Sequence, residues 1–451
     1  MSAARQPTTP DRAARLAALQ DERGRLSRLI GEGKQRGEDV SEQIARSREL
    51  SQQIKQLEAE ETTPEPPAAE PLTEPAALQG AVLSDPAQWA DLREEWDELL
   101  AQSDSPCIFL TWEWVTTCWR FYGPPHTPLL VTVRTPEGEL VGLAPCFVTQ
   151  TPARHLPRGA LAFIGSGTEA DGDYLDLILH PRFRAQALET ILDVLLAQRP
   201  LWSQIVWQHV AAETPALPLL LSALGERGLL LAAVPERRTV CGVLPDSFAA
   251  FLENLPSRHR RRFAGQIARR LERDFGSIEY RTDAGSEAFV ERFHAMGRLH
   301  SQRFESKGEH GSFANEQCYQ FVLETSRLFA ERGWVRLREL HLDGRLVASR
   351  LGFLYAGTCY DFNGGFDPEY ATHEVSHALL SRCVEDSIAE RVRVYDLLAG
   401  EHFYKTQYFA GRRSLLTLNL WPQEAGATAK VGARLALREL RRSVRRWRSR
   451  A

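Results

Sequence analysis

Hydrophobic and polar positions between residues 334 and 409 follow the periods of several strands and one helix. The turn Asp343-Gly344 separates two strand-like runs, as in a β-hairpin. Apolar residues at helical spacing predict an amphipathic helix over His377–Ala389. The strands expected around these features are Val335–Leu342, Leu346–Tyr355, Thr358–Gly364 and Arg393–Leu398. This order predicts a mostly antiparallel sheet that opens where the third strand parts from the fourth.

The region between Ala81 and Leu244 shows a similar order of elements. Its predicted helices and strands are, in chain order, Pro86–Ala101, Thr111–Phe121, Leu129–Val133, Leu140–Val148, Tyr174–Leu179, Phe183–Ala197, Ile205–His209 and Leu217–Arg227. Glu137–Leu143 matches Asp343–Ser349 in its pattern at a spacing of about 200 residues, which indicates an internal repeat. We therefore predict an α/β protein with two tandem domains, residues 80–244 and 245–424, of which the second is the active half.

Three further segments flank these domains. In residues 1–61, apolar residues recur at helical spacing and are interrupted by Gly31, Gly33 and Gly37. Because each glycine destabilises a continuous helix by about 1 kcal/mol, we predict two helices that fold back as an antiparallel hairpin. Residues 62–79 are rich in proline and glutamate and predict an extended linker. The pattern of residues 425–451 predicts a basic amphipathic helix. The first interpretation is that this helix lies on a membrane surface, and the alternatives are that it binds RNA or is simply solvated.

The composition narrows the class of protein. The chain has 451 residues, 43% of them hydrophobic, and a formal net charge of −4, which is typical of a globular protein and excludes nucleic-acid binding through bulk charge. Seven cysteines without Cys-x-x-Cys spacing predict reduced thiols and a cytoplasmic location. No run approaches the roughly 18 apolar residues of a membrane span, so we expect membrane contact only as peripheral contact at the inner face.

Several motifs carry a resemblance to known families. The region 334–409, the basic helix that begins with Ser257–Arg262 and the segment Arg303–Gly308 resemble the GNAT acetyltransferase fold. Within it, they are similar to the bacterial CelD/BcsL-like subgroup found near exopolysaccharide and cellulose genes, although this chain lacks a tryptophan near Arg303. Tyr404-Lys405 resembles an element of the FemABX aminoacyl transferases. Asp21–Glu58 resembles a short form of the tRNA-binding helical arm of seryl-tRNA synthetases.

The resemblance implies tandem GNAT-like domains and an acyltransferase. The expected donor is acyl-CoA, such as acetyl-CoA, and the expected acceptor is an amine or hydroxyl of a sugar or exopolysaccharide precursor. The alternatives are an aminoacyl-tRNA-dependent transferase and a catalytically silent scaffold of polysaccharide assembly. In the first alternative, the hairpin of residues 1–61 would contact tRNA. The simpler interpretation of the hairpin is a coiled coil that packs helices together, also between the subunits of a homo-oligomer.

Acyl transfer requires a donor held in place, a base, and a group that stabilises the oxyanion. The sequence has no Gly-x-Ser-x-Gly motif, no Cys/His nucleophile signature and no metal-ligand spacing, which favours direct attack. Backbone N–H groups before the crossover helix suit a diphosphate, and nearby arginines suit an anionic partner. The Gln/Arg-x-x-Gly-x-Gly/Ala loop of ordinary acetyl-CoA enzymes is absent. The residues expected to bind the donor are His373, Glu374, Val375, Ser376, Arg260 and Arg261.

Lys405 is the residue that we expect to matter most for the chemistry. The FemABX resemblance implies that it lies at the mouth of the sheet beside Tyr404, where it stabilises negative charge on the acyl carbonyl or on a donor phosphate. We expect Lys405→Ala to abolish transfer and to leave the fold intact. The general base remains open between Glu305, Asp361 and His300.

Overall fold

The computed structural model describes residues 77–400 and 402–422, together with seven isolated positions before residue 77. The chain divides into two compact units, Met1–Pro75 and Ala76–Ala451. The predicted hairpin, most of the predicted linker and the predicted terminal helix lie outside the described residues. Among the isolated positions, Arg46 forms an ion pair with Glu22 at 3.1 Å.

No helix within the described ranges is both long enough and apolar enough to cross a membrane.

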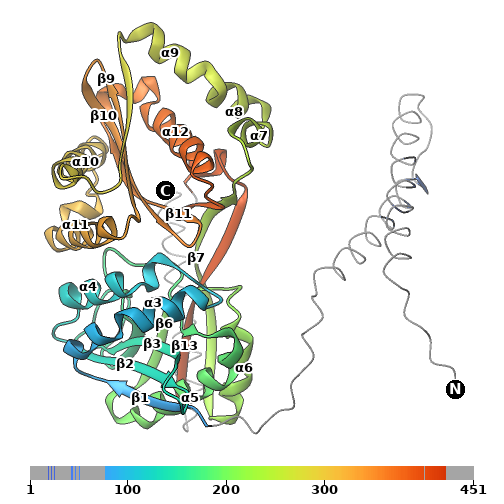
Figure 1. The fold of residues 1–451 in the computed structure, drawn as a ribbon, viewed down its shortest axis with the longest axis vertical. Coiled ribbons are helices and arrows are strands. Elements are labelled where there is room, and N and C mark those ends of the chain that lie inside the picture. The colour runs from blue at the N-terminus through green and yellow to red at the C-terminus, as the bar shows by residue number, and fades with distance from the viewer. Residues whose placement is uncertain are drawn as a thin grey trace, which may run out of the picture. The chain divides into compact units, whose positions relative to one another are not determined.

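One sheet of 13 strands extends through the second unit (Figure 1). Across the sheet, its strands are β1 (Gln79–Leu83), β2 (Thr127–Arg134), β3 (Leu140–Val148), β4 (Ala160–Phe163), β6 (Gln204–Ala211), β13 (Gly411–Pro422), β7 (Leu229–Val243), β12 (Val394–Ala399), β11 (Thr358–Phe366), β10 (Arg345–Tyr355), β9 (Val335–Leu342) and β8 (Ile278–Asp283). The short strand β5 (Ile178–Leu179) pairs with β3 beside this path. The mixed, mostly antiparallel α/β sheet that the sequence predicts is therefore confirmed.

Each half of the sheet opens along a pair of parallel strands. β11 and β12 pair only over Thr358–Tyr360 of β11. β4 and β6 pair only at Ala160 and Leu161 of β4. Beyond these pairs, the strands leave backbone N–H and C=O groups that need other partners. The opening between the third and fourth strands of the second half lies where the sequence predicts it.

Two long strands join the halves. β7 pairs with β12 of the second half near its C-terminal end and with β13 along most of its length. β13 pairs in turn with β6, so the last described strand of the chain returns to the sheet of the first half (Figure 1). The predicted boundary at residue 244 falls directly after β7, but β13, which follows the boundary in the chain, pairs with β6 and β7, which both precede it.

Helices cover the sheet; in the second half, α10 and α11 lie on one side and α12 on the other (Figure 1). The α-helices are α3 (Arg93–Gln102), α4 (Trp112–Tyr122), α5 (Arg184–Ala197), α6 (Ala216–Glu226), α7 (Phe248–Glu253), α8 (Ser257–Arg261), α9 (Ile267–Asp274), α10 (Phe289–Glu305), α11 (Glu316–Glu331) and α12 (Val375–Ala389). The backbone of α10 approaches β11 so closely that a Cβ atom at Gly365 would lie 2.2 Å from the backbone nitrogen of His300. This contact requires glycine at position 365.

Two predicted features of the first half differ from the structure. The strand expected over Tyr174–Leu179 is reduced to β5, because the residues before it form a loop that binds the second half. β4 was not predicted, because a run of four residues is too short for a clear alternation of polar and apolar positions. The sequence therefore predicts most elements of the first half but misses β1, β4 and β7, of which β7 is the longest described strand.

An aromatic core connects the halves. Trp114 of α4 packs edge-on against Phe321 of α11 at 5.0 Å between ring centroids and against Phe362 of β11 at 5.8 Å. Phe109, just before α4, contacts Trp114 and also Tyr360 of β11. Because aromatic pairs at these distances stabilise a fold beyond their buried area, they fix the first half against β11.

Candidate functional site

Lys405 lies in the opening between β11 and β12, at the start of a short 3-10 turn. Its Nζ donates to the backbone oxygens of Leu397, Leu398 and Ala399 at 2.6, 3.3 and 2.6 Å. These three residues follow the last residue pair between β11 and β12, so their carbonyl groups have no hydrogen-bond donor on β11. The ammonium group of Lys405 takes the place of that donor. The side chain is buried, and it supports the end of β12 from within the sheet mouth.

The surroundings of the Lys405 ammonium group bring its pKa close to neutral pH. Burial lowers the pKa of Lys405 to about 8, although the carboxylates of Asp361 and Asp173 oppose that shift. Asp361 is held by Arg350, whose Nε lies 3.1 Å from Oδ1 of the carboxylate. At neutral pH Lys405 is therefore mostly protonated, and the opening carries a buried positive charge.

A loop of the first half contacts the same end of β12. Tyr174 donates its hydroxyl to Oδ2 of Asp396 at 2.5 Å, and burial raises the pKa of Asp396 to about 6. Oδ2 of Asp173 accepts a hydrogen bond from the Ala399 N–H at 2.8 Å, and its Oδ1 lies 3.0 Å from Nη2 of Arg237. Both halves therefore contribute side chains to the opening.

A polar cleft of about 330 Å³ lies beside the opening, with walls from both halves. Phe362, Leu398 and Ala399 contribute its apolar and backbone surface at the ends of β11 and β12. Its polar lining residues are Arg154, Glu169, Asp171, Asp173, Arg237, Ser312 and Asn363. Because carboxylates, guanidinium groups and an amide line the same space, the cleft can both donate to and accept from a ligand rich in hydroxyl groups.

Asp171 in this lining belongs to a chain of buried charges. Its Oδ1 accepts from the Thr168 N–H at 2.9 Å, and its Oδ2 lies 3.4 Å from Nε2 of His209. Nδ1 of His209 lies 3.2 Å from Oε2 of Glu236, although neither ring nitrogen is aligned for a hydrogen bond. Burial opposes charge on His209, but both carboxylates raise its pKa above the ordinary value. Burial also opposes charge on Glu236, but His209 and Thr417 lower its pKa to about 2.

At the N-terminus of α12, which the sequence assigns to a donor diphosphate, the N-cap residue Glu374 makes no capping hydrogen bond and pairs with two arginines. Glu374 forms ion pairs with Arg262 and, through Oε2 at 3.1 Å, with Arg270. Arg270 also donates to the Thr372 backbone oxygen at 2.9 Å. A carboxylate thus lies where the prediction places a diphosphate, between two arginines that could otherwise bind one.

The other residues predicted to bind the acyl donor have different surroundings from Glu374. His373 lies 3.6 Å from Asp274, Val375 is buried, and Ser376 is half-buried. Arg260 donates to the Leu252 backbone oxygen at 3.1 Å and so caps the end of α7, whereas Arg261 is exposed. The arginine that reaches the start of α12 is Arg262, which was not among the predicted binding residues.

The three candidate bases do not come together. Glu305 is exposed at the last position of α10, and Asp361 is paired with Arg350. His300 packs between Phe304 and Phe313, and burial lowers its pKa to about 4, so its ring is neutral at neutral pH.

Tyr404, predicted beside Lys405, lies at the rim of the opening. Its ring stacks on that of His402 at 6.1 Å between centroids, and the side chain is half-buried. The guanidinium of Arg303 reaches toward the same region and donates to the Gly364 backbone oxygen at 3.3 Å. Among the described residues, no group of three or more His, Cys, Asp or Glu side chains is arranged to hold a metal ion.

The site residues predicted from the sequence do not include those that the first half contributes, namely Asp171, Asp173, Tyr174, His209 and Glu236. The signal for the first three was the run Asp171-Gly172-Asp173-Tyr174, in which two carboxylates flank a glycine. No local pattern marks His209 and Glu236, because they reach Asp171 only through the fold.

A comparison with protein-family models matches residues 236–406 to the model described as acetyltransferase (GNAT) domain. No curated protein sequence matches the chain. The crystal structure of FemX is similar with a TM-score of 0.53 at 12% identity, covering 75% of this chain and 96% of that one. A tandem GNAT protein from the clavulanic acid biosynthesis pathway has a TM-score of 0.43 at 14% identity, covering 76% of this chain and 98% of that one.

At such identities, structural similarity shows the fold alone. The family match places a GNAT acetyltransferase domain in the second half, and the protein is a transferase enzyme. The CelD/BcsL-like subgroup and the likeness of residues 21–58 to a synthetase arm remain predictions.

Proposed function

Starting from a GNAT-type transferase domain over residues 236–406, we propose that the protein transfers an acyl group from acyl-CoA to a sugar-like acceptor. The acceptor, which presents an amine or a hydroxyl, would bind in the polar cleft between the halves and attack the acyl carbon directly. The observation that carries this proposal is the position of the cleft, whose walls include the ends of β11 and β12 beside Lys405.

The lining of the cleft suits a hydroxylated acceptor. A volume of about 330 Å³ falls at the lower end of the range of ligand sites, which is roughly 300–1,000 Å³. Glu169, Asp171 and Asp173 can accept hydrogen bonds from hydroxyl or amino groups, and Arg154 can donate to ring or carboxyl oxygens. An apolar acceptor would leave these charged groups without partners, which is unfavourable.

Asp171 is the carboxylate best placed to act as the general base. It is half-buried on the cleft wall, with Oδ1 held by the Thr168 N–H and Oδ2 beside His209. In the proposed step, a carboxylate oxygen of Asp171 takes the proton of the acceptor amine or hydroxyl as that group bonds to the acyl carbon. The thioester C–S bond then breaks, CoA leaves as its thiolate, and the proton held by Asp171 passes to solvent. His209 and Glu236 act as positioning residues that hold the carboxylate in place.

Lys405 would contribute positive charge to the negatively charged tetrahedral intermediate. Its shorter hydrogen bonds, both at 2.6 Å, go to Leu397 and Ala399, whereas the one to Leu398 is 3.3 Å long. The longer bond is the weaker one, so the corresponding proton is the easiest to redirect to an oxyanion. Even without direct contact, a buried charge favours nearby negative charge more strongly than an exposed one.

A second candidate is transfer from an aminoacyl-tRNA. The observation that favours it is Glu374, whose carboxylate lies at the start of α12 and repels a diphosphate unless it moves. The donor therefore needs a direct test, in which the full-length protein is titrated by calorimetry with acetyl-CoA and, separately, with charged and uncharged tRNA. Saturable binding of acetyl-CoA supports the first proposal, and binding of charged tRNA alone supports the second.

The role of Asp171 is tested by Asp171→Asn with a substrate pair found in that titration. Loss of a general base typically lowers kcat by about 10²- to 10⁴-fold. Glu169→Gln is the matched control, because Glu169 lines the same cleft but is exposed and has no place in the buried chain of charges. Equal small losses in both variants would contradict the assignment of Asp171 as the base.

A further inference from the structure

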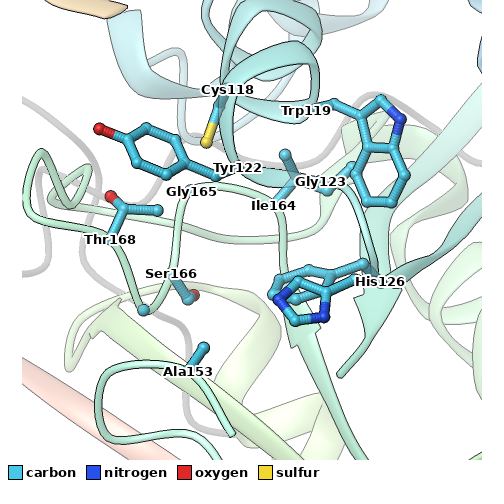
Figure 2. Close-up of a pocket in the computed structure, with 12 residues that line it drawn as sticks. Cys118, Trp119, Tyr122, Gly123, His126, Ala153, Ile164, Gly165, Ser166 and Thr168 are labelled. Atoms are coloured by element: carbon cyan, nitrogen blue, oxygen red, sulfur yellow. The ribbon is translucent and has the colours of Figure 1, made fainter. Parts of the chain in front are cut away.

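A second, smaller pocket lies in the first half, between α4 and the loop that follows β4 (Figure 2). We propose that it is a binding site for a neutral, ring-sized ligand with an apolar body and one polar edge. The pocket has a volume of about 140 Å³. The lining residues that carry the argument are Trp119, Tyr122, His126, Ala153, Ser166 and Thr168.

Hydroxyl groups without partners are the main evidence for a ligand. Oγ of Ser166 and Oγ1 of Thr168 are buried and have no hydrogen-bond partner in the protein. The two residues are only 3% and 7% exposed. Figure 2 shows the Ser166 hydroxyl directed into the pocket. Buried polar groups in native proteins almost always have a partner in the protein or in bound water, so these two need one from water or from a ligand in the pocket.

The backbone of the loop keeps these hydroxyls in place. Gly165 and Gly167 both adopt positive φ angles, 105° and 72°, which other residues rarely adopt. A Cβ atom at Gly167 would also lie 2.8 Å from Cδ1 of Leu156. The glycines thus allow the loop to turn at the pocket and to present Ser166 between them.

The lining is uncharged, which decides the charge of the ligand. None of the residues that line the pocket is a lysine, arginine, aspartate or glutamate. Burial lowers the pKa of His126, and Nδ1 of this residue accepts a hydrogen bond from the Gln150 N–H at 3.2 Å. The imidazole is therefore neutral near pH 7, and an ion would enter without a counter-charge, at a high desolvation cost.

Size and wall composition indicate a ring. An engineered cavity of about 150 Å³ lined by aliphatic and aromatic residues binds benzene, so about 140 Å³ is enough for one six-membered ring. Phe147 lies beside both Trp119 and His126, with ring centroids 6.4 and 5.3 Å apart. These rings form the apolar wall, and the loop hydroxyls form the polar one.

The pocket and the catalytic cleft share one loop. Thr168 lines the pocket with its side chain, and its backbone N–H donates to Asp171 on the cleft wall. A ligand bound to Ser166 and Thr168 would therefore also restrain the segment that carries Asp171. The site itself does not depend on the proposed acyl transfer, because Thr168 serves that proposal only through its backbone N–H and no other residue of the proposal lines the pocket.

The test uses full-length protein with phenol as the polar probe and benzene as its apolar analogue, both measured by calorimetry and by ligand-observed NMR. We expect phenol to bind at one site more tightly than benzene. Ser166→Ala and Thr168→Val should each weaken phenol binding by about two- to tenfold, the usual net effect of one hydrogen bond, and leave benzene binding unchanged. Ala153→Phe should remove binding of both probes, since the Ala153 side chain faces the pocket (Figure 2).

Ser312→Ala is the matched control, because Ser312 lines the catalytic cleft and not this pocket. It should bind phenol as the unmodified protein does, and thermal unfolding of each variant checks that it is folded. Equal affinity for phenol and benzene, or phenol binding that survives both hydroxyl substitutions, would overturn the proposal. Absence of binding by either probe would overturn it as well and would indicate that only water occupies the pocket.

Discussion

At the scale of single residues, the burial of Lys405 differs most from what the sequence predicts. A lysine at the start of a short helix is usually exposed, yet this one is buried and donates to three backbone carbonyls. Lys405→Ala would leave those carbonyls without a donor, at about 1–3 kcal/mol for each that water does not reach. The expectation that this substitution leaves the fold intact is therefore revised, and a test of Lys405 must keep its hydrogen bonds.

The pH dependence of turnover provides such a test. Because burial lowers the pKa of Lys405 to about 8, its charge is lost above that pH, whereas an ordinary lysine keeps its charge to about pH 10. If the charge is needed, kcat should fall by about tenfold for each pH unit above 8. Lys405→Arg, which stays charged, should keep its activity at pH 9.

Unfolding cannot produce the same profile. The folded-state pKa of Lys405 lies below its ordinary value of 10.5, so the unfolded state binds more protons between pH 8 and 10.5. This group therefore makes the folded protein more stable as the pH rises through that window. A rate that stays constant to pH 10 in the unmodified enzyme would exclude a role for the Lys405 charge.

At the scale of elements, the start of α12 is where the predicted donor site can be tested. Glu374 pairs with two arginines that come from the basic segment of residues 257–274. Arg262 also donates to Gln407, two residues after Lys405. The basic segment, α12 and the turn that carries Lys405 are therefore connected. The high density of arginine in this segment, which the sequence assigns to an anionic partner, is used here to bind a carboxylate of the same chain.

Glu374→Gln should therefore strengthen the binding of an anionic donor. Freeing two guanidinium groups for a phosphate should lower the Kd for acetyl-CoA by about tenfold at low salt, the size of one charge-assisted hydrogen bond. The gain should shrink at high salt, because screening weakens exposed charge pairs. Glu369→Gln is the control, since Glu369 is 72% exposed and pairs only with Arg345. Unchanged or weaker binding in Glu374→Gln would contradict a phosphate site at this helix end.

At the scale of the whole molecule, β13 makes the halves depend on each other. It is the last described strand, and it lies between β6 and β7. Three of its leucines, Leu415, Leu418 and Leu420, are at most 1% exposed. Burial of each contributes about 1.5–3 kcal/mol, and the sum is comparable with the whole free energy of unfolding of a typical domain.

Two truncated chains test this arrangement. A chain that ends at residue 410 lacks β13 and should fail to unfold cooperatively, with exposed edges on β6 and β7 that promote aggregation. A chain that ends at residue 422 keeps β13 and should melt in a single transition close to that of the full-length protein. Circular dichroism and size-exclusion chromatography distinguish the two results. Cooperative unfolding of the shorter chain close to the full-length temperature would show that β13 is not needed to hold the sheet together.

The sequence by itself determined the class of fold, most helices and strands (although not β7 or α11), and the opening between the third and fourth strands of the second half. These features depend on periodicity within ten to twenty residues and on turn residues such as Asp343-Gly344, which neighbouring positions largely decide. The importance of position 405 also came from a local motif, Tyr404-Lys405.

Only the tertiary structure decided which side chains share the site. Asp171, His209 and Glu236 meet because β4, β6, β13 and β7 follow one another across the sheet, and no pattern along the chain records that contact. The pairing of Glu374 with arginines more than a hundred positions earlier is equally long-range. Contacts between distant segments depend on the packing of the whole sheet, so local spacing predicts the elements and leaves their side-chain partners undetermined.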